Sequence, residues 1–280
     1  QQSPHLTIQD FNGGERDDFD GILDLYYGQY EGDSFTIWFG RNQFPFWRQN
    51  ELFWDDDVTI TGSSLSVGSS ADGNVEFITG AFYLPDGGWD LNGQLYAGQA
   101  VYRNSFGDLK LTAGTGIYAL RGRDGAENLR NGNGARDYTI LGNEIQIQRK
   151  VFGMPFQLGA DAYINLESYS SASDDPFTAR NFDEDFGYVL SATVQPGKLT
   201  AGYYYSYLET LAVNASYAED DFVRWGSDGQ TDSSDLRGHE IRLGYQATKK
   251  LNILGRLYLV DAITSEQDGM RFRVDFNYRF

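Results

Sequence analysis

The last ten residues, Arg271-Phe-Arg-Val-Asp-Phe-Asn-Tyr-Arg-Phe280, alternate strictly between two kinds of side chain. One set is apolar and ends on the terminal aromatic residue, and the other set is charged or amidic. Successive side chains of a β-strand point to opposite faces, so this alternation predicts a strand with one apolar and one polar face.

The same period of two recurs along the chain and predicts thirteen strands in all. The clearest alternation lies at Leu109–Ala119, Phe156–Glu167, Lys198–Tyr207, Gly238–Ala247, Leu251–Val260 and Arg271–Phe280. Weaker alternation predicts the others at about 22–30, 35–41, 57–67, 74–84, 90–103, 138–151 and 186–195.

The connections between these strands alternate in length. Very short turns are predicted at Ser105–Gly107, Phe152–Pro155, Pro196–Gly197 and Lys249–Lys250. Between them lie long polar segments at 121–137, 168–185, 209–236 and 262–269. Short turns on one rim and long loops on the other are typical of barrels that span an outer membrane.

Composition excludes several other classes of protein. The mean hydropathy is -0.48 although 40% of the residues are hydrophobic, and no apolar run reaches the length of a membrane helix. The net charge of -18 argues against a nucleic-acid partner, since phosphate binding needs a basic face. There is no cysteine, so neither a disulfide framework nor a thiolate site is expected.

Alternation by itself fits a soluble β-sandwich as well as a membrane barrel. Strands near ten residues, aromatic residues at strand ends and unequal rims favour the barrel. We therefore predict an all-β, antiparallel transmembrane β-barrel, with residues 1–280 forming a single barrel domain.

Two stretches resemble known proteins. The terminal strand resembles the C-terminal signature of bacterial outer-membrane proteins, whose assembly machinery recognises a final Phe. The motifs Gly40-Arg-Asn42, Pro45-Phe-Trp47, Leu52-Phe-Trp-Asp55 and Asp57-Val-Thr59, followed by Gly62, resemble a porin family of Gram-negative outer membranes. The resemblance covers residues 1–62 and extends to the rest only in pattern; the Pro-x-Gly that the family often has at Gly62 is missing here.

The resemblance implies a trimeric, water-filled channel with sixteen strands, of which three would be missing from this chain. A strand count agrees: if the last strand runs toward the periplasm, so does 22–30, and residues 1–21 start outside the cell. Single-chain bacterial barrels normally have an even number of strands. We therefore expect either an odd number of missing strands or one short strand at residues 5–11.

Strand parity predicts which charged residues face the lumen. The candidates with a role in the pore are Arg242, Arg256, Arg273, Lys110, Asp24, Glu76, Asp161, Glu240 and Asp275. The three arginines come from successive strands and would form a basic strip. Acidic residues on the opposite side would then create a transverse electric field across the pore. The alternative is a solvated wall in which these charges have no special role.

The segment Arg41–Asp57 is the predicted constriction, because it is unusually aromatic for a solvated loop. Its candidate residues are Arg41, Phe46, Trp47, Arg48, Trp54 and Asp55. Folding into the barrel, or packing on a neighbouring subunit, would bury the rings. The alternative for Trp47 and Trp54 is an aromatic girdle at the membrane interface.

The remaining expectations concern partners and chemistry. Acidic loops could hold Ca²⁺ or Mg²⁺ that bridges to lipopolysaccharide, but no calcium-binding loop motif is present and no cofactor is expected. His5 and His239 lie in no catalytic pattern, so an outer-membrane hydrolase is disfavoured. The functions left open are a porin for small hydrophilic solutes or ions and a non-conducting, adhesin-like barrel.

Overall fold

The computed structural model describes residues 25–56, 58–85, 91–122, 136–218, 222 and 234–279. Thirteen strands form one antiparallel sheet, in which each strand pairs with its neighbours in sequence. They are β1 (Tyr26–Glu31), β2 (Phe35–Asn42), β3 (Ile60–Gly68), β4 (Asn74–Pro85), β5 (Leu91–Phe106), β6 (Leu109–Arg121), β7 (Tyr138–Val151), β8 (Met154–Asn165), β9 (Phe186–Val194), β10 (Leu199–Leu208), β11 (Leu236–Gln246), β12 (Leu251–Ala262) and β13 (Asp268–Tyr278). All thirteen predicted strands are confirmed.

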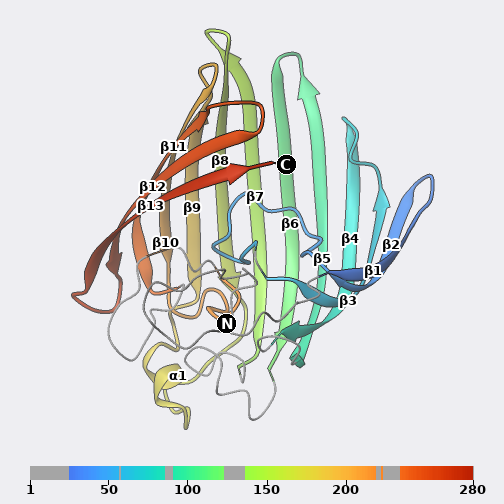
Figure 1. The fold of residues 1–280 in the computed structure, drawn as a ribbon. Helices are drawn as coiled ribbons and strands as arrows, with labels where there is room; N and C mark the ends of the chain where they lie inside the picture. The colour runs from blue at the N-terminus through green and yellow to red at the C-terminus, as the bar shows by residue number, and fades with distance from the viewer. Residues whose placement is uncertain are drawn as a thin grey trace, which may run out of the picture.

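The sheet is strongly curved (Figure 1), and we call the space on its concave side the hollow. Tight turns gather at the top of this view, and the long connections gather at the bottom. The turn after β5 shows why the short rim is so compact. Its two residues are Gly107 and Asp108, and Gly107 adopts a positive φ of 66° that favours glycine. The predicted separation of short turns from long loops is confirmed.

The sheet is not closed in the described part of the chain, where no ladder joins β1 to β13. Neighbouring strands are antiparallel and their number is odd, so β1 and β13 run in the same direction. Each therefore has one edge without a strand partner among the described residues.

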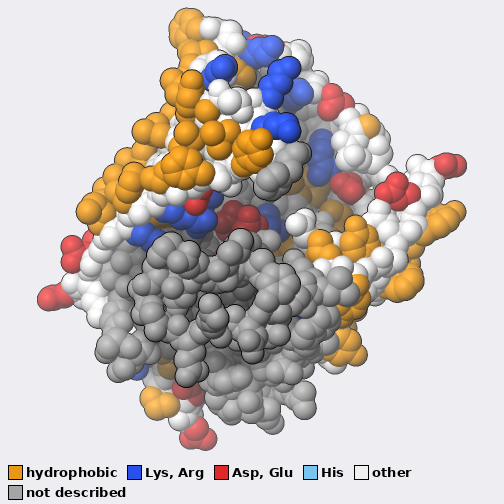
Figure 2. Space-filling view, in the orientation of Figure 1, with side chains coloured by type: hydrophobic (Ala, Val, Ile, Leu, Met, Phe, Trp, Pro, Cys, Tyr) orange, Lys and Arg blue, Asp and Glu red, His pale blue; other side chains and the backbone are white. Residues whose placement is uncertain are grey.

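The outer face of the sheet is apolar and exposed, whereas the inner face carries buried charges beside its apolar residues, so the exposed face has the reverse of the polarity in a soluble protein. Leu243 and Phe272 are 63% and 69% exposed on the outer face, whereas Asp161 and Glu240 are 2% exposed on the inner face. Figure 2 shows hydrophobic side chains over the outer walls, with charged side chains in the hollow between them. A β-sandwich buries its apolar faces, so this distribution excludes that alternative.

Several predicted strand ends differ from the structure by a few residues, and two of them have a visible cause. The strand expected at 57–67 begins only at Ile60, because Val58 and Thr59 belong to the preceding loop. The Val58 carbonyl accepts a hydrogen bond from Trp54 Nε1 (3.0 Å), which holds it away from the β-ladder. The strand expected to reach Glu167 ends at Asn165. The backbone N–H of Leu166 still donates to the Thr139 carbonyl of β7 (2.7 Å), but that of Glu167 donates to the Asn165 side chain (3.2 Å).

One helix, α1 (Pro176–Arg180), lies in the connection between β8 and β9. Asp175 caps it by accepting hydrogen bonds from the backbone N–H groups of Phe177 and Thr178. Within the described residues, no helix is long and apolar enough to cross a membrane.

Candidate functional site

Three arginines stand side by side on the inner face of the sheet. The register places Arg242 of β11 opposite Arg256 of β12, and Arg256 opposite Arg273 of β13. Their sequence neighbours Leu243 and Val274 are exposed on the outer face, as alternation requires. We call these three residues the arginine row. A register slip of one residue would turn an arginine outward.

Two carboxylates accompany the arginine row. Arg242 Nη2 donates to Glu240 Oε2 (2.8 Å), and Arg273 Nε donates to Asp275 Oδ1 (2.7 Å). Arg256 Nε lies 3.7 Å from the other oxygen of Asp275. The three guanidinium groups outnumber these two carboxylates, so the group of five side chains has one excess positive charge.

The connection from β2 to β3, residues 43–59, carries a buried aromatic cluster, and we call it the inserted loop. Phe44 stacks on Trp54 with ring centroids 4.4 Å apart, and Phe53 stacks on Tyr163 of β8 at 5.6 Å. Tyr163 lies on the inner face and is 1% exposed. The loop therefore folds into the hollow and packs against the wall.

Hydrogen bonds fix the middle of the inserted loop to two strands. The backbone N–H of Trp47 donates to Gln99 Oε1, and Gln99 Nε2 donates back to the Trp47 carbonyl, both at 2.8 Å. On β8, Asp161 accepts from Gln49 Nε2 (2.7 Å) and Asn50 Nδ2 (2.6 Å). Bonds to a carboxylate are stronger than bonds between neutral groups, so Asp161 is the stronger anchor.

A second connection reaches the inserted loop from β10. Residues 210–218 are buried, and the carbonyl of Tyr217 accepts a hydrogen bond from the backbone N–H of Asp55 (2.8 Å). The ring of Tyr217 also stacks on Trp54, with centroids 5.1 Å apart. Two connections from opposite parts of the sheet therefore meet inside the hollow.

Glu51 directly follows the anchored residues Gln49 and Asn50 in the inserted loop. Its charge interacts with those of Arg242 and Arg256. Burial, together with the charges of Asp56 and Asp55, raises the pKa of Glu51 to about 7, although Arg242 and Arg256 oppose the rise. Glu51 is therefore an acid of the loop whose charge acts on both arginines. Its side chain changes protonation close to neutral pH.

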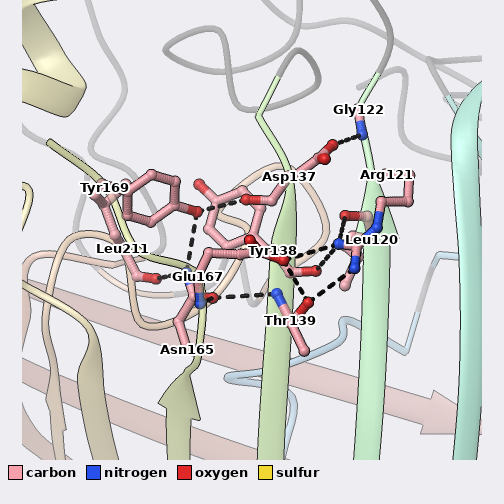
Figure 3. A network of polar contacts seen from close by, with 10 residues as sticks. All are labelled: Leu120, Arg121, Gly122, Asp137, Tyr138, Thr139, Asn165, Glu167, Tyr169 and Leu211. Atoms are coloured by element: carbon pink, nitrogen blue, oxygen red, sulfur yellow. Dashed lines mark hydrogen bonds and ion pairs between the residues drawn. The ribbon is translucent and has the colours of Figure 1, made fainter. Parts of the chain in front are cut away.

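A polar network ties β6, β7 and β8 together where they reach the long loops (Figure 3). Arg121 donates to Glu167 Oε1 and Thr139 Oγ1, both at 3.0 Å. Asn165 Nδ2 donates to the carbonyl of Leu211 (2.8 Å), which links this rim to the buried 210–218 connection. The network therefore fixes the lower end of the wall against which the inserted loop packs.

Comparison with known proteins gives structural matches only. No protein-family model matches the chain. No curated protein matches it in sequence. The solved structure of OccK10 (OpdN) from Pseudomonas aeruginosa matches with a TM-score of 0.54 at 11% identity, over 89% of this chain and 70% of that one. The fold is that of an outer-membrane β-barrel porin.

Two other solved structures show weaker matches. A BenF-like porin from Pseudomonas fluorescens Pf-5 has a TM-score of 0.41 at 13% identity, over 89% of this chain and 74% of that one. The outer membrane protein OprD from Pseudomonas aeruginosa has a TM-score of 0.41 at 14% identity, over 87% and 75%.

Within this porin fold, the predicted constriction residues gather in the inserted loop. Phe46, Trp47, Arg48, Trp54 and Asp55 all lie in it, and Arg41 stands at its base, where Arg41 Nε donates to Thr59 Oγ1 (2.8 Å). Burial lowers the pKa of Arg48, with Glu51, Asp56 and Asp55 opposing the change. Trp54 is fully buried, so the interfacial girdle does not apply to it.

The other predicted lumen residues are spread along the inner face. Glu76 accepts hydrogen bonds from Arg103 Nη1 (2.8 Å) and Ser66 Oγ (2.7 Å). Lys110 borders a cavity of about 600 Å³ near the short-turn rim. Asp24 lies outside the described residues. Of the predicted lumen residues, one group forms, which consists of Arg242, Arg256, Arg273, Glu240 and Asp275. Asp161 lies apart from this group on β8, where it holds the inserted loop.

Sequence reasoning missed the residues that hold the loop. Gln49, Asn50 and Gln99 are uncharged, and a search for charge patterns passes over them. For Gln99 a signal existed, because it lies at an inward position of a predicted strand. Glu51 was also missed, because the loop carries other acidic residues at Asp55–Asp57 and nothing in the sequence distinguishes one carboxylate from another.

No metal site emerges from the described residues. They contain no cluster of three or more His, Asp or Glu side chains placed to hold a metal ion. His239 is exposed, and its Nδ1 lies 2.7 Å from the hydroxyl of Tyr203. His5 lies outside the described residues.

Proposed function

We propose that this chain is an outer-membrane porin, which forms a water-filled channel for passive diffusion of small hydrophilic solutes or ions. The observation that carries the proposal is the reversed polarity of the sheet. Large apolar side chains are exposed on its outer face, and its ion pairs lie on the inner face. A wall of this kind is stable only with lipid on one side and water on the other.

The inserted loop and the arginine row form the proposed constriction. The loop narrows the hollow from the side of β5 to β8, and the arginine row faces it from β11 to β13. A positive wall opposite acidic loop residues creates a transverse field, which orders water and disfavours apolar solutes. Arg242, Arg256 and Arg273 are therefore the proposed selectivity residues, and Glu240 and Asp275 hold two of them in place.

A bacterial outer-membrane location and contact with lipopolysaccharide follow from the same proposal. Membership of the Gram-negative porin family rests on the motifs at residues 40–62, and the homotrimer rests on that resemblance. Light scattering of the detergent-solubilised protein measures the assembly directly. Three copies per particle are expected, and a single copy would contradict the trimer.

Conductance in planar lipid bilayers tests the channel. Purified, folded protein should give stepwise, ohmic current increases, whereas detergent alone should give none. Shortening the inserted loop by deleting Gln49–Glu51 should raise the conductance of each step. Silent wild-type protein in both orientations would contradict the porin.

One observation favours a second candidate, a non-conducting barrel that binds a surface or partner through its loops. The inserted loop and the 210–218 connection meet inside the hollow and could fill it. The loop-shortened variant separates the two candidates. A plugged barrel should be silent as wild type and should conduct only after the deletion, whereas a porin conducts in both forms.

A further inference from the structure

We infer that the inner face of the sheet carries a second binding site at the short-turn rim, built on Lys110 and Lys150, for a small hydroxylated solute that bears a phosphate group. A sugar phosphate has this chemistry. The site is separate from the arginine row, and its role in the passage of solutes rests on the proposed function.

The two lysines lie on neighbouring strands, each next to a short turn, and share the inner face. Lys110 of β6 lies opposite Gln148 of β7 in the register, and Lys150 follows Gln148 by two positions. Glu144, on the same face of β7, is 4% exposed and lies opposite Asp161. Diagonal neighbours in an antiparallel pair are about 7–8 Å apart, which lets the two long lysine side chains meet at one ligand.

Both lysines line the cavity of about 600 Å³ at this rim. Among the described residues that line it, the only carboxylate is that of Asp108, which accepts a hydrogen bond from Arg149 Nε (2.9 Å). Neither Lys110 nor Lys150 has an ion-pair partner in the described part of the chain. Two ammonium charges are therefore left without a counter-charge, and Lys or Arg groups placed in this way favour anions and phosphate in a pore.

The remaining polar lining consists of amides and hydroxyls. Gln148 Nε2 donates to Gln157 Oε1 (2.7 Å), which orients the Gln157 amide and leaves its nitrogen without a hydrogen-bond partner among the described residues. Thr193 and Thr200 contribute hydroxyl groups. Such groups both donate and accept, so they suit a ligand that carries hydroxyl groups. The volume also exceeds what a phosphate alone needs, since sites for small molecules measure roughly 300–1,000 Å³.

A row of inward positions joins this site to the arginine row. Each member lies directly opposite the next in the register, in the order Lys110, Gln148, Gln157, Thr193, Gly202 and Arg242. The row leads from the short-turn rim at β6 to the middle of β11, and it contains no carboxylate. Figure 2 shows Lys and Arg side chains gathered between the walls toward the top, where the short turns lie. An anionic solute that leaves the arginine row therefore meets no negative side chain along this row.

Calorimetric titration of the folded protein in detergent, at low ionic strength, tests the site with glucose 6-phosphate as the probe. Wild-type protein should bind it saturably and should not bind glucose, which lacks the phosphate. Lys110→Gln/Lys150→Gln should weaken the binding about tenfold or more, because it removes two charged hydrogen-bond donors. Succinate, which carries two carboxylates, should bind more weakly than glucose 6-phosphate.

A matched control keeps the change in net charge the same. Lys249→Gln/Lys250→Gln removes two lysines from the β11–β12 turn on the same rim, outside the cavity, and should bind like wild type. The arginine row is intact in both double variants, and circular dichroism checks that both are folded. Equal binding by the two variants, or wild-type binding no stronger than that of glucose, would overturn the site. Equal or tighter binding of succinate would overturn the assignment to a phosphate. The titration needs no open channel, so its outcome is independent of whether the protein conducts in bilayers.

Discussion

Removing one partner of an ion pair on the inner wall should destabilise the sheet. Glu240 is 2% exposed and its neighbour Arg242 is 21% exposed, so the pair is largely removed from water. Loss of one partner of a buried pair typically costs about 3–5 kcal/mol, because the remaining charge stays buried. Since Arg242 retains some exposure, the cost here should lie below that range.

Arg242→Gln should therefore lower the free energy of unfolding by about 2 kcal/mol. The double variant Glu240→Gln/Arg242→Gln should be less destabilised than the single variant, because two amides can bond to each other without a buried charge. Urea unfolding in lipid vesicles, followed by tryptophan fluorescence, measures both. If both variants were equally destabilised, the loss of stability in Arg242→Gln would not come from the unpaired charge of Glu240.

The arginine row should govern ion selectivity. Replacing Arg242, Arg256 and Arg273 with glutamine removes three positive charges from the proposed constriction, so reversal potentials should shift toward cation selectivity. A matched control removes three arginines outside the constriction in Arg149→Gln/Arg180→Gln/Arg237→Gln, and it should leave reversal potentials unchanged. The same shift in both triple variants would mean that overall charge, rather than the row, sets selectivity.

At the scale of the element, the inserted loop depends on a few polar anchors. Asp161 accepts two amide hydrogen bonds from the loop, and a bond to a charged group contributes about 1.5–3 kcal/mol. Asp161→Ala should loosen the loop and increase both the conductance and the open-channel noise of single channels. Asp108→Ala removes an exposed turn carboxylate and serves as the control. Unchanged noise in Asp161→Ala would indicate that the aromatic contacts alone hold the loop.

The short helix α1 gives a pH-dependent test with a defined sign. Partial burial opposes the shift, but hydrogen bonds from Thr178 and Arg136 lower the pKa of Asp175 to about 2. A carboxyl group in an unfolded chain has a pKa of about 3.9. The stabilisation is therefore complete above pH 4 and is lost as the pH falls toward 2.

Proteolysis of the connection 166–185 by pepsin should therefore accelerate between pH 4 and pH 2, beyond the change in pepsin activity on an unstructured peptide of the same sequence. Asp175→Asn should be cleaved faster than wild type at pH 4 and show a smaller acceleration. An identical pH profile for the variant would contradict the role of this cap.

Strands were predictable from the sequence, and loops were not, for a physical reason. A strand between lipid and water must alternate apolar and polar side chains, so adjacent residues such as Arg273 and Val274 are enough to predict it. The fold of a loop depends on contacts with distant residues. Phe53 on Tyr163, and Gln49 on Asp161, join positions more than a hundred residues apart. The aromatic content of the inserted loop indicated burial, but the place of burial required the structure.

At the scale of the whole molecule, the reversed polarity predicts unequal responses to the same substitution. Leu243→Arg places a charge on the outer face in mid-strand and should cost about 2–4 kcal/mol. Thr200→Arg places it on the inner face of β10, at nearly the same height, and should be tolerated. The yield of folded protein in lipid vesicles measures the difference. Equal yields would contradict the assignment of the outer face to lipid.

The open edges of β1 and β13 are a second property of the whole sheet. Unpaired backbone groups at an edge cannot be left in hydrocarbon, because each costs several kcal/mol. Direct pairing of β1 with β13 would be parallel, in contrast to every other pair of the sheet. The sixteen-stranded closed barrel expected from the family resemblance stays a prediction, which the strand count of an experimental structure in lipid can check.

The strict alternation of side chains also bears on how such a chain could be exported. A segment is retained in a bilayer as a helix when about twenty consecutive residues are mainly apolar. Here polar residues or glycine interrupt the apolar residues of every strand within a few positions, so the translocation machinery meets no stretch that it would release sideways into the first membrane. A continuous apolar surface forms only when the strands pair into the sheet. The unfolded chain can therefore cross the inner membrane, and the folded sheet can insert into the outer membrane.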